Sequence, residues 1–118
     1  MFKVIVAGGR EFNDYALLRT KLDQALRNRK NDEILIVSGK ARGADALGER
    51  YAKERGYEVS EHPADWDKYG NSAGYIRNKE MAEEADALMA FWDGKSRGTM
   101  HIINLAKEKG LKTLVVRY

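Results

Sequence analysis

The stretch Val4-Ile5-Val6-Ala7-Gly8-Gly9-Arg10 is a short apolar run that ends in a glycine turn, and it decides the fold. The same pattern recurs at residues 34–43, where ILIV precedes SGKARG, and at residues 87–99, where ALMAF precedes WDGKSRGT. A stretch with helical character follows each turn. A buried strand, a glycine turn and a helix form the unit that holds phosphate groups in many α/β proteins. Three such units would place all three turns on one edge of one sheet.

The spacing of apolar residues predicts an alternation of strands and helices along the whole chain. Strands are predicted at residues 3–7, 34–38, 57–61, 87–91 and 111–116, and helices at 14–29, 44–55, 73–84 and 98–109. Residues 62–72, which include the one Pro, are predicted to form the longest loop. Asp14 is the expected cap at the start of the first helix, and Gly56 and Gly110 are expected to end the second and the last.

This alternation predicts an α/β fold, with a five-stranded parallel sheet and helices on both faces. Right-handed crossovers give a doubly wound, Rossmann-like sheet with strand order 3-2-1-4-5. The strand at 57–61 alternates polar and apolar residues, so we expect it at a sheet edge. The first and fourth strands are then neighbours where the winding reverses. A ligand is expected in the crevice outside the carboxyl ends of these two strands.

Size and composition limit the remaining possibilities. The 118 residues, with 43% hydrophobic and 33% charged side chains, predict a single domain over residues 1–118. Cysteine is absent, which excludes disulfides and thiolate metal sites and fits a reducing compartment. The first apolar run is too short for a signal peptide and no run approaches a membrane span, so a soluble cytoplasmic protein is expected. The net charge of +3 does not by itself indicate a nucleic-acid partner.

Two of the turns have residues suited to close contact with an anion. Gly8-Gly9-Arg10 allows the backbone to approach a ligand, although a plain tight turn explains the same residues. The glycine spacing differs from the dinucleotide fingerprint G-x-G-x-x-G, so a classical dehydrogenase is not expected. In the second turn, Ser38 could donate a hydroxyl hydrogen bond at the end of the strand, and Gly39 and Gly43 would let the backbone fold under a ligand. Asp45 in the following helix could cap amides or accept hydrogen bonds from a ribose or from Arg42.

The third turn lacks the features of a nucleotide kinase or ATPase. Gly94-Lys95-Ser96 would need a glycine five positions earlier to be a Walker A motif, and Met89 stands there. Gly98-Thr99 at the start of a helix is better suited to hold an anion, and a cap without a ligand is the alternative. The two histidines, His62 and His101, are too far apart in sequence to suggest a metal site or a catalytic dyad. No metal and no cofactor are expected.

Further candidates lie on the third helix and among the aromatic residues. Arg77, followed by Asn78, could reach the crevice and bind a phosphate or carboxylate at two points, or could lie on a solvated helix face. Trp66 and Trp92 could stack on a base, although tryptophan more often serves packing.

Taken in order, these motifs resemble a known family. They are VAGGREF at residues 6–12, SGKARGAD at 38–45, PADW at 63–66, GYIRNKEM at 74–81 and FWDGKSRGT at 91–99. The combination is similar to the YspA-like, cpYpsA-related type of the SLOG superfamily of Rossmann-like domains, over nearly the whole chain. Other branches of that superfamily include phosphoribohydrolases, DNA-processing proteins and sensors of NAD-derived signals. The resemblance implies a nucleotide or ADP-ribose-like ligand and a homodimer or homotetramer.

The resemblance and the turns together define an expected ligand site. Residues expected to hold phosphates are Gly8, Gly9, Arg10, Ser38, Gly39, Gly43, Arg77, Gly98 and Thr99. Residues expected to contact sugar or base are Asp45, Asn78, Trp92 and Asp93.

One departure from the family pattern bears on activity. The hydrolase branch has a glutamate three residues after the Gly-Thr pair, and Ile102 stands at that position here. This favours a protein that senses or sequesters a nucleotide or an NAD- or ADP-ribose-derived molecule. The alternatives are a nucleoside-monophosphate phosphoribohydrolase or N-glycosidase, in which Glu11, Asp45 or Asp93 replaces the missing carboxylate, and a single-stranded DNA-binding protein.

Overall fold

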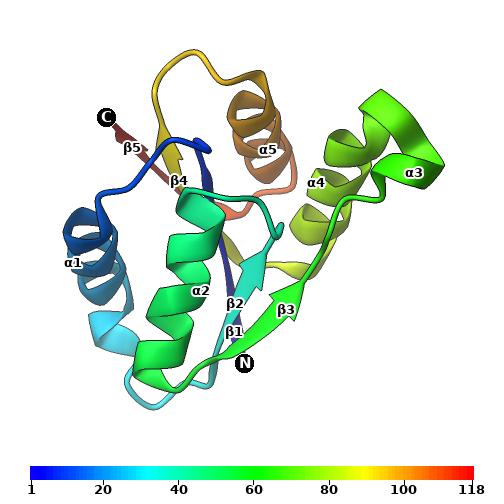
Figure 1. The fold of residues 1–118 in the computed structure, drawn as a ribbon. Coiled ribbons are helices and arrows are strands. Elements are labelled where there is room, and N and C mark those ends of the chain that lie inside the picture. The colour runs from blue at the N-terminus through cyan, green and yellow to red at the C-terminus, as the bar shows by residue number, and fades with distance from the viewer.

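The computed structural model describes residues 1–118 as alternating strands and helices (Figure 1). The strands are β1 Phe2–Gly8, β2 Ile34–Ser38, β3 Glu58–Glu61, β4 Ala87–Trp92 and β5 Lys112–Arg117. The helices are α1 Tyr15–Leu26, α2 Ala44–Arg55, α3 Trp66–Tyr69, α4 Ala73–Glu84 and α5 Arg97–Glu108, with short 3₁₀ segments η1 Arg27–Arg29 and η2 Gly70–Ser72. None of the helices is both long and apolar enough to cross a bilayer.

The five strands form one parallel sheet in the order β3-β2-β1-β4-β5, which confirms the predicted topology. The register places Val4 of β1 between Ile36 of β2 and Ala87 of β4. Strand β3 lies at one edge, as its alternating polar residues predicted, and β5 lies at the other. The carboxyl ends of β1 and β4 are therefore adjacent at the centre of the sheet, where the winding reverses.

Alternate residues of the central strand pack on opposite faces of the sheet, because side chains point to opposite sides along a strand. Val4 and Val6 belong to the core shared with α1 and α2. Ile5 and Ala7 belong to the core shared with α4 and α5. Figure 1 shows these two helix pairs on the two sides of the sheet. Both faces are covered, and for this reason β1 has the continuous apolar sequence on which the strand prediction rested.

Two predicted elements differ from the structure. The first helix ends at Leu26, and its expected last turn is the 3₁₀ segment η1. The predicted loop at 62–72 contains α3 and η2, and α3 projects from the body beside α4 in Figure 1. Helix α3 begins because the Asp65 carboxylate accepts a hydrogen bond from the Lys68 N–H at 3.0 Å. A four-residue helix has no apolar period, so the sequence pattern could not reveal it.

The predicted helix signals hold at the other ends. Asp14 caps α1 by accepting a hydrogen bond from the Leu17 N–H at 3.1 Å. Gly56 ends α2 in the left-handed conformation, with φ of 73°. Helices α2 and α4 and strand β2 have the predicted boundaries. Strands β3 and β4 differ from their predictions by one residue at one end, and β1 and β5 by one residue at both ends.

Candidate functional site

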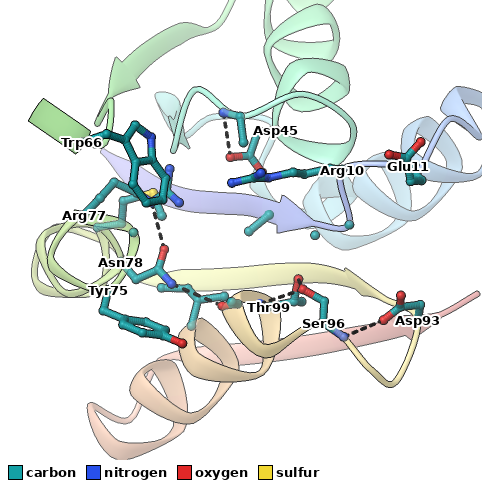
Figure 2. Close-up of a pocket in the computed structure, with 18 of the residues that line it drawn as sticks. Arg10, Glu11, Asp45, Trp66, Tyr75, Arg77, Asn78, Asp93, Ser96 and Thr99 are labelled. Atoms are coloured by element: carbon teal, nitrogen blue, oxygen red, sulfur yellow. Dashed lines mark hydrogen bonds between the residues drawn. The ribbon is translucent and has the colours of Figure 1, made fainter. Parts of the chain in front are cut away.

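A cavity of about 410 Å³ opens at the carboxyl ends of β1 and β4 (Figure 2). Nine of the thirteen residues expected at a ligand site line it. They are Gly8, Gly9, Arg10, Asp45, Arg77, Asn78, Asp93, Gly98 and Thr99. The other four, which are Ser38, Gly39, Gly43 and Trp92, do not line the cavity.

The turn after β1 is closely packed on its neighbours. A Cβ atom on Gly8 would lie 2.9 Å from the Ala44 Cβ and would also collide with the Phe91 carbonyl oxygen. The Gly9 N–H donates to that same Phe91 oxygen at 3.1 Å. The Gly9 carbonyl accepts from the N–H groups of Phe12 and Ala44, each at 3.2 Å. The Gly9 amide is thus engaged within the protein, and these glycines bring the backbone close to β4 and α2.

The loop after β2 is fixed by a cluster of polar side chains around the buried Ser38 hydroxyl. The Ser38 hydroxyl is fully buried, donates to Glu49 Oε2 at 2.6 Å and accepts from the Lys40 N–H at 3.1 Å. Lys40 has a positive φ of 60°, and its ammonium group pairs with Glu49 at 2.9 Å and Glu61 at 2.7 Å. Ser38 therefore anchors the loop and does not face the cavity.

Gly39 and Gly43 allow two close approaches within the wall of the cavity. A Cβ atom on Gly39 would lie 2.7 Å from Arg77 Nη1 and 2.9 Å from Asp45 Oδ2. The Gly39 carbonyl accepts a hydrogen bond from that Arg77 nitrogen. Gly43 is pressed against the turn after β1, where a Cβ atom would lie 2.6 Å from the Arg10 carbonyl oxygen. Both glycines shape the site without contacting its interior.

Asp45 is a buried carboxyl group in the cavity wall. Only 5% of the residue is exposed, and its Oδ2 accepts a hydrogen bond from the Ala41 N–H at 3.2 Å. Burial raises the pKa of Asp45 to about 6, against the opposing effects of the Ala41 hydrogen bond, Arg77 and Arg10. Asp45 caps an amide of the preceding loop, and its carboxyl group is placed to change charge near neutral pH.

Arg77 reaches the cavity from α4. Its Nη1 donates to the Gly39 carbonyl, and its Nε donates to Asn78 Oδ1 at 3.0 Å. Burial lowers the pKa of the Arg77 guanidinium, Asp45 acts to raise it, and Arg10 acts to lower it further. Asn78 is buried, and its Nδ2 lies 3.2 Å from the Gly98 carbonyl and 3.1 Å from His101 Nδ1. The Asn78 side chain therefore links Arg77 to the start of α5.

The start of α5 is held by a network of caps. Asp93 Oδ1 accepts from the N–H groups of Lys95 at 2.8 Å and Ser96 at 2.9 Å, and these bonds lower the pKa of Asp93. The Ser96 hydroxyl oxygen accepts from the Thr99 N–H at 3.3 Å and from the Thr99 hydroxyl at 3.1 Å. Trp92 Nε1 donates to the Ser96 carbonyl at 3.1 Å, so Trp92 supports the loop from outside the cavity. Open space lies beside Gly98.

Replacing the Ser96 cap should destabilise the protein. Ser96→Ala removes the acceptor for the Thr99 N–H, and loss of such a cap costs about 1 kcal/mol. Urea unfolding measures this change in the free energy of unfolding. Ser72→Ala is the matched control, because Ser72 precedes α4 at the same position but makes no capping hydrogen bond. Equal losses in the two variants would contradict the role given to Ser96.

Besides the expected Arg77 and Asn78, further residues of α4 line the cavity. Gly74, Arg77, Asn78 and Met81 all line it, and their spacing of i, i+3, i+4 and i+7 places them on one face of α4. The spacing from Arg77 is the sequence signal that identifies Gly74 and Met81 as neighbours on this face.

Three aromatic residues at the cavity are partly exposed: Trp66 at 49%, Tyr75 at 46% and Tyr118 at 46%. Trp66 was considered as a stacking residue, and its ring lies 3.5 Å from where a Cβ on Gly74 would stand. Tyr118 carried no signal, because only the fold brings the residue after β5 to the turn at Gly9. Within residues 1–118, no group of three or more His, Asp or Glu side chains is placed to hold a metal ion.

Comparison with known proteins gives a family match and structural relatives. The model of the YspA, cpYpsA-related SLOG family matches residues 2–69. Gene 61 protein of Mycobacterium phage D29 is 34% identical over 120 residues, which cover 97% of this chain and 95% of that protein.

Two solved structures share the fold. DNA processing protein A (DprA) from Streptococcus pneumoniae superposes with a TM-score of 0.75 at 20% identity, over 98% of this chain and 50% of DprA. The protein TM1055 superposes with a TM-score of 0.68 at 22% identity, over 96% of this chain and 72% of TM1055. The chain thus spans half the length of DprA. At these identities the two structures support the Rossmann-like fold alone.

Proposed function

Because the chain belongs to the YspA, cpYpsA-related SLOG family, we propose that its cavity binds a nucleotide or an NAD- or ADP-ribose-derived small molecule. The protein would then sense or sequester that molecule. The observation that carries the proposal is that two guanidinium groups, those of Arg10 and Arg77, and several aromatic rings line the same cavity at the carboxyl ends of β1 and β4. Its volume of about 410 Å³ suits a small-molecule ligand.

In this proposal the phosphates of the ligand would bind at the side of the cavity that carries the two arginines. Figure 2 shows Arg10 extending from the turn after β1 toward Asp45, and Arg77 entering from α4. Arg77 uses Nε and Nη1 within the protein, which leaves Nη2 to donate to a phosphate oxygen. The start of α5 at Gly98 adds a helix N-terminus, whose dipole favours an anion.

The base and sugar are placed toward the aromatic side. Trp66 and Tyr75 border the cavity from α3 and α4 and keep about half of their surface exposed. Such rings can stack on a purine, and a stacked base is worth about 1–3 kcal/mol. Asp45, whose carboxyl group is influenced by the charges of both arginines, would accept a hydrogen bond from a ribose hydroxyl.

Binding without cleavage is proposed because of Ile102. This residue lines the cavity and is buried, so an apolar side chain occupies the position where hydrolases of the superfamily have glutamate. Asp45 is the observation that favours the alternative N-glycosidase, since its pKa of about 6 suits an acid or base. Chromatography after incubation with AMP separates the two. Adenine release that Asp45→Asn abolishes would establish the enzyme.

Truncation of Arg77 tests the proposed ligand class. Arg77→Ala should weaken ADP-ribose binding by about 1.5–3 kcal/mol, the cost of losing a hydrogen bond to a charged group. Isothermal titration calorimetry measures the affinity, and a thermal melt of each variant checks that it folds. Lys79→Ala is the matched control, because it removes one positive charge from an exposed position on the same helix. Unchanged affinity in Arg77→Ala would reject the role of Arg77.

The salt dependence of the binding affinity distinguishes the DNA-binding alternative from small-molecule binding. Single-stranded DNA releases counterions when it binds, so its affinity falls steeply with salt. We expect tight binding of ADP-ribose and no binding of oligothymidylate at moderate salt. Tight oligothymidylate binding with a steep salt slope, combined with no ADP-ribose binding, would favour DNA. The homodimer or homotetramer and the cytoplasmic location stay predictions, and light scattering after size exclusion tests the first.

A further inference from the structure

The orientation of the Asn78 carboxamide is fixed by its neighbours. Arg77 Nε can only donate a hydrogen bond, so the Asn78 atom that faces it at 3.0 Å must be the oxygen. The Gly98 carbonyl can only accept, so the atom that faces it at 3.2 Å must be the nitrogen. Both neighbours therefore require the same orientation, with Oδ1 toward Arg77 and Nδ2 toward α5.

This orientation determines the protonation state of His101. Asn78 Nδ2 lies 3.1 Å from His101 Nδ1, and an amide nitrogen can only donate. Nδ1 must then carry a lone pair, so the imidazole is neutral with its proton on Nε2. The edge of the Tyr75 ring contacts the imidazole from α4, with ring centroids 4.5 Å apart. Burial lowers the pKa of His101, and the charge on Glu108 of α5 opposes that shift.

We propose that Asn78 and His101 are positioning residues for Arg77, because a neutral His101 holds the Asn78 carboxamide in the orientation that accepts from Arg77 Nε. The inference rests on the proposed function in that Arg77 is taken to bind the anionic part of the ligand. Asn78 was expected to contact sugar or base. All its polar atoms are used within the protein, and this assigns it the positioning role.

Protonation of His101 breaks this arrangement. The new Nδ1–H points at Asn78 Nδ2, so two donors face each other. Turning the carboxamide over relieves that contact but places Nδ2 against the Arg77 Nε–H and Oδ1 against the Gly98 carbonyl oxygen. In the turned arrangement Arg77 loses Asn78 as an acceptor and keeps the Gly39 carbonyl as its remaining partner, and in the unturned one the carboxamide that accepts from Arg77 is no longer held by His101. Ligand affinity should therefore fall as His101 gains its proton.

The sign of this effect is diagnostic. An additional positive charge near the cavity would by itself attract an anionic ligand and raise the affinity. The positioning role predicts the opposite, a loss of about tenfold, as expected for one broken hydrogen bond of a charged group. A purely structural role of His101 predicts no dependence on its proton.

The first test needs no ligand. Nitrogen-15 spectra of the unmodified protein, from about pH 8 to about pH 5, follow both histidines, the Asn78 amide and the Arg77 Nε–H. We expect the Nε2–H tautomer of His101 at high pH, and Asn78 and Arg77 resonances that shift together with the His101 titration. His62 lies in a separate contact, 2.6 Å from Glu84, so changes in its spectrum should not be accompanied by changes at Asn78 and Arg77. Asn78 and Arg77 signals that ignore His101 would overturn the proposal.

The second test uses ADP-ribose, whose diphosphate keeps its charge throughout this range. We expect the dissociation constant of the unmodified protein, divided by that of His101→Gln, to rise about tenfold as pH falls. The reason is that the glutamine side chain has an acceptor oxygen for the Asn78 amide, and this oxygen does not titrate. Effects of Asp45 are common to both proteins and cancel in the ratio. His62→Gln should behave as the unmodified protein. A constant or falling ratio would overturn the proposal. Absence of ADP-ribose binding at every pH would reject that ligand, while the spectra still decide the positioning role.

Discussion

Gly43→Ala should lower the free energy of unfolding by about 2–6 kcal/mol. Gly43 has φ of 79° and ψ of −128°, a sparsely populated conformation outside the left-handed helical region that costs an L-residue about 1–3 kcal/mol. The added Cβ would also lie 2.6 Å from the Arg10 carbonyl oxygen and collide with the Gly9 carbonyl oxygen. These atoms are backbone and cannot turn aside as a side chain can. Relief requires the turn after β1 to move away from α2, with an overpacking cost of about 1–3 kcal/mol.

Gly56→Ala is the matched control for this prediction. Gly56 also has a positive φ, 73°, but a Cβ there would meet nothing within 4 Å. Its replacement should cost about 1 kcal/mol, the conformational part alone. Urea denaturation gives both values. Gly43→Ala should also weaken ADP-ribose binding, because the displaced turn carries Arg10, whereas Gly56→Ala should bind normally. Equal destabilisation of the two variants would show that the contact with Arg10 and Gly9 is unimportant.

The fold followed from the sequence because its determinants are local and repeated. Residues 4–7 are all apolar because both faces of β1 are covered. Helices α1 and α2 cover the face that carries Val4 and Val6, and α4 and α5 cover the face that carries Ile5 and Ala7. Covered strands joined by helices leave few arrangements, and the right-handed crossover rule selects the observed order. Helix α3 was missed because its one capping bond, from Lys68 to Asp65, gives no periodic signal.

The site was predicted less completely, for a different physical reason. Residue types identify a glycine turn, but they do not tell which atoms face the ligand and which face the protein. Ser38 and Trp92 have the chemistry of ligand contacts, yet their donors are used by Glu49 and by the Ser96 carbonyl. Tyr118 reaches the cavity through packing between distant segments. Such choices depend on distances between elements, which no local pattern contains.

The burial of Asp45 should produce a stability change with pH that opposes the usual acid denaturation. Its pKa is about 6 in the folded protein and 3.8 when the carboxyl group is unperturbed. Between these values the unfolded chain has released the proton and the folded protein keeps it, so stability falls as pH rises. The effect is absent below about pH 4 and complete above about pH 6, where ionised Asp45 costs about 3 kcal/mol.

Asp45→Asn isolates this effect, because asparagine keeps an oxygen for the Ala41 N–H and never ionises. Relative to the unmodified protein, the variant should gain stability steadily from about pH 4 to about pH 6 and keep the gain at neutral pH. The difference between the two urea-unfolding curves at each pH removes the contributions of the other carboxyl groups. Asp67→Asn, at an exposed position in α3, should show no such trend. A stabilising effect at neutral pH would mean that the chain retains a costly buried charge at Asp45 despite the nearby Arg10 and Arg77, as expected when a carboxylate serves ligand recognition and not folding. The opposite result would be an Asp45→Asn variant whose stability, measured against the unmodified protein, falls between acid and neutral pH. That result would make Asp45 a structural partner of the two arginines and remove it from the proposed ligand contacts.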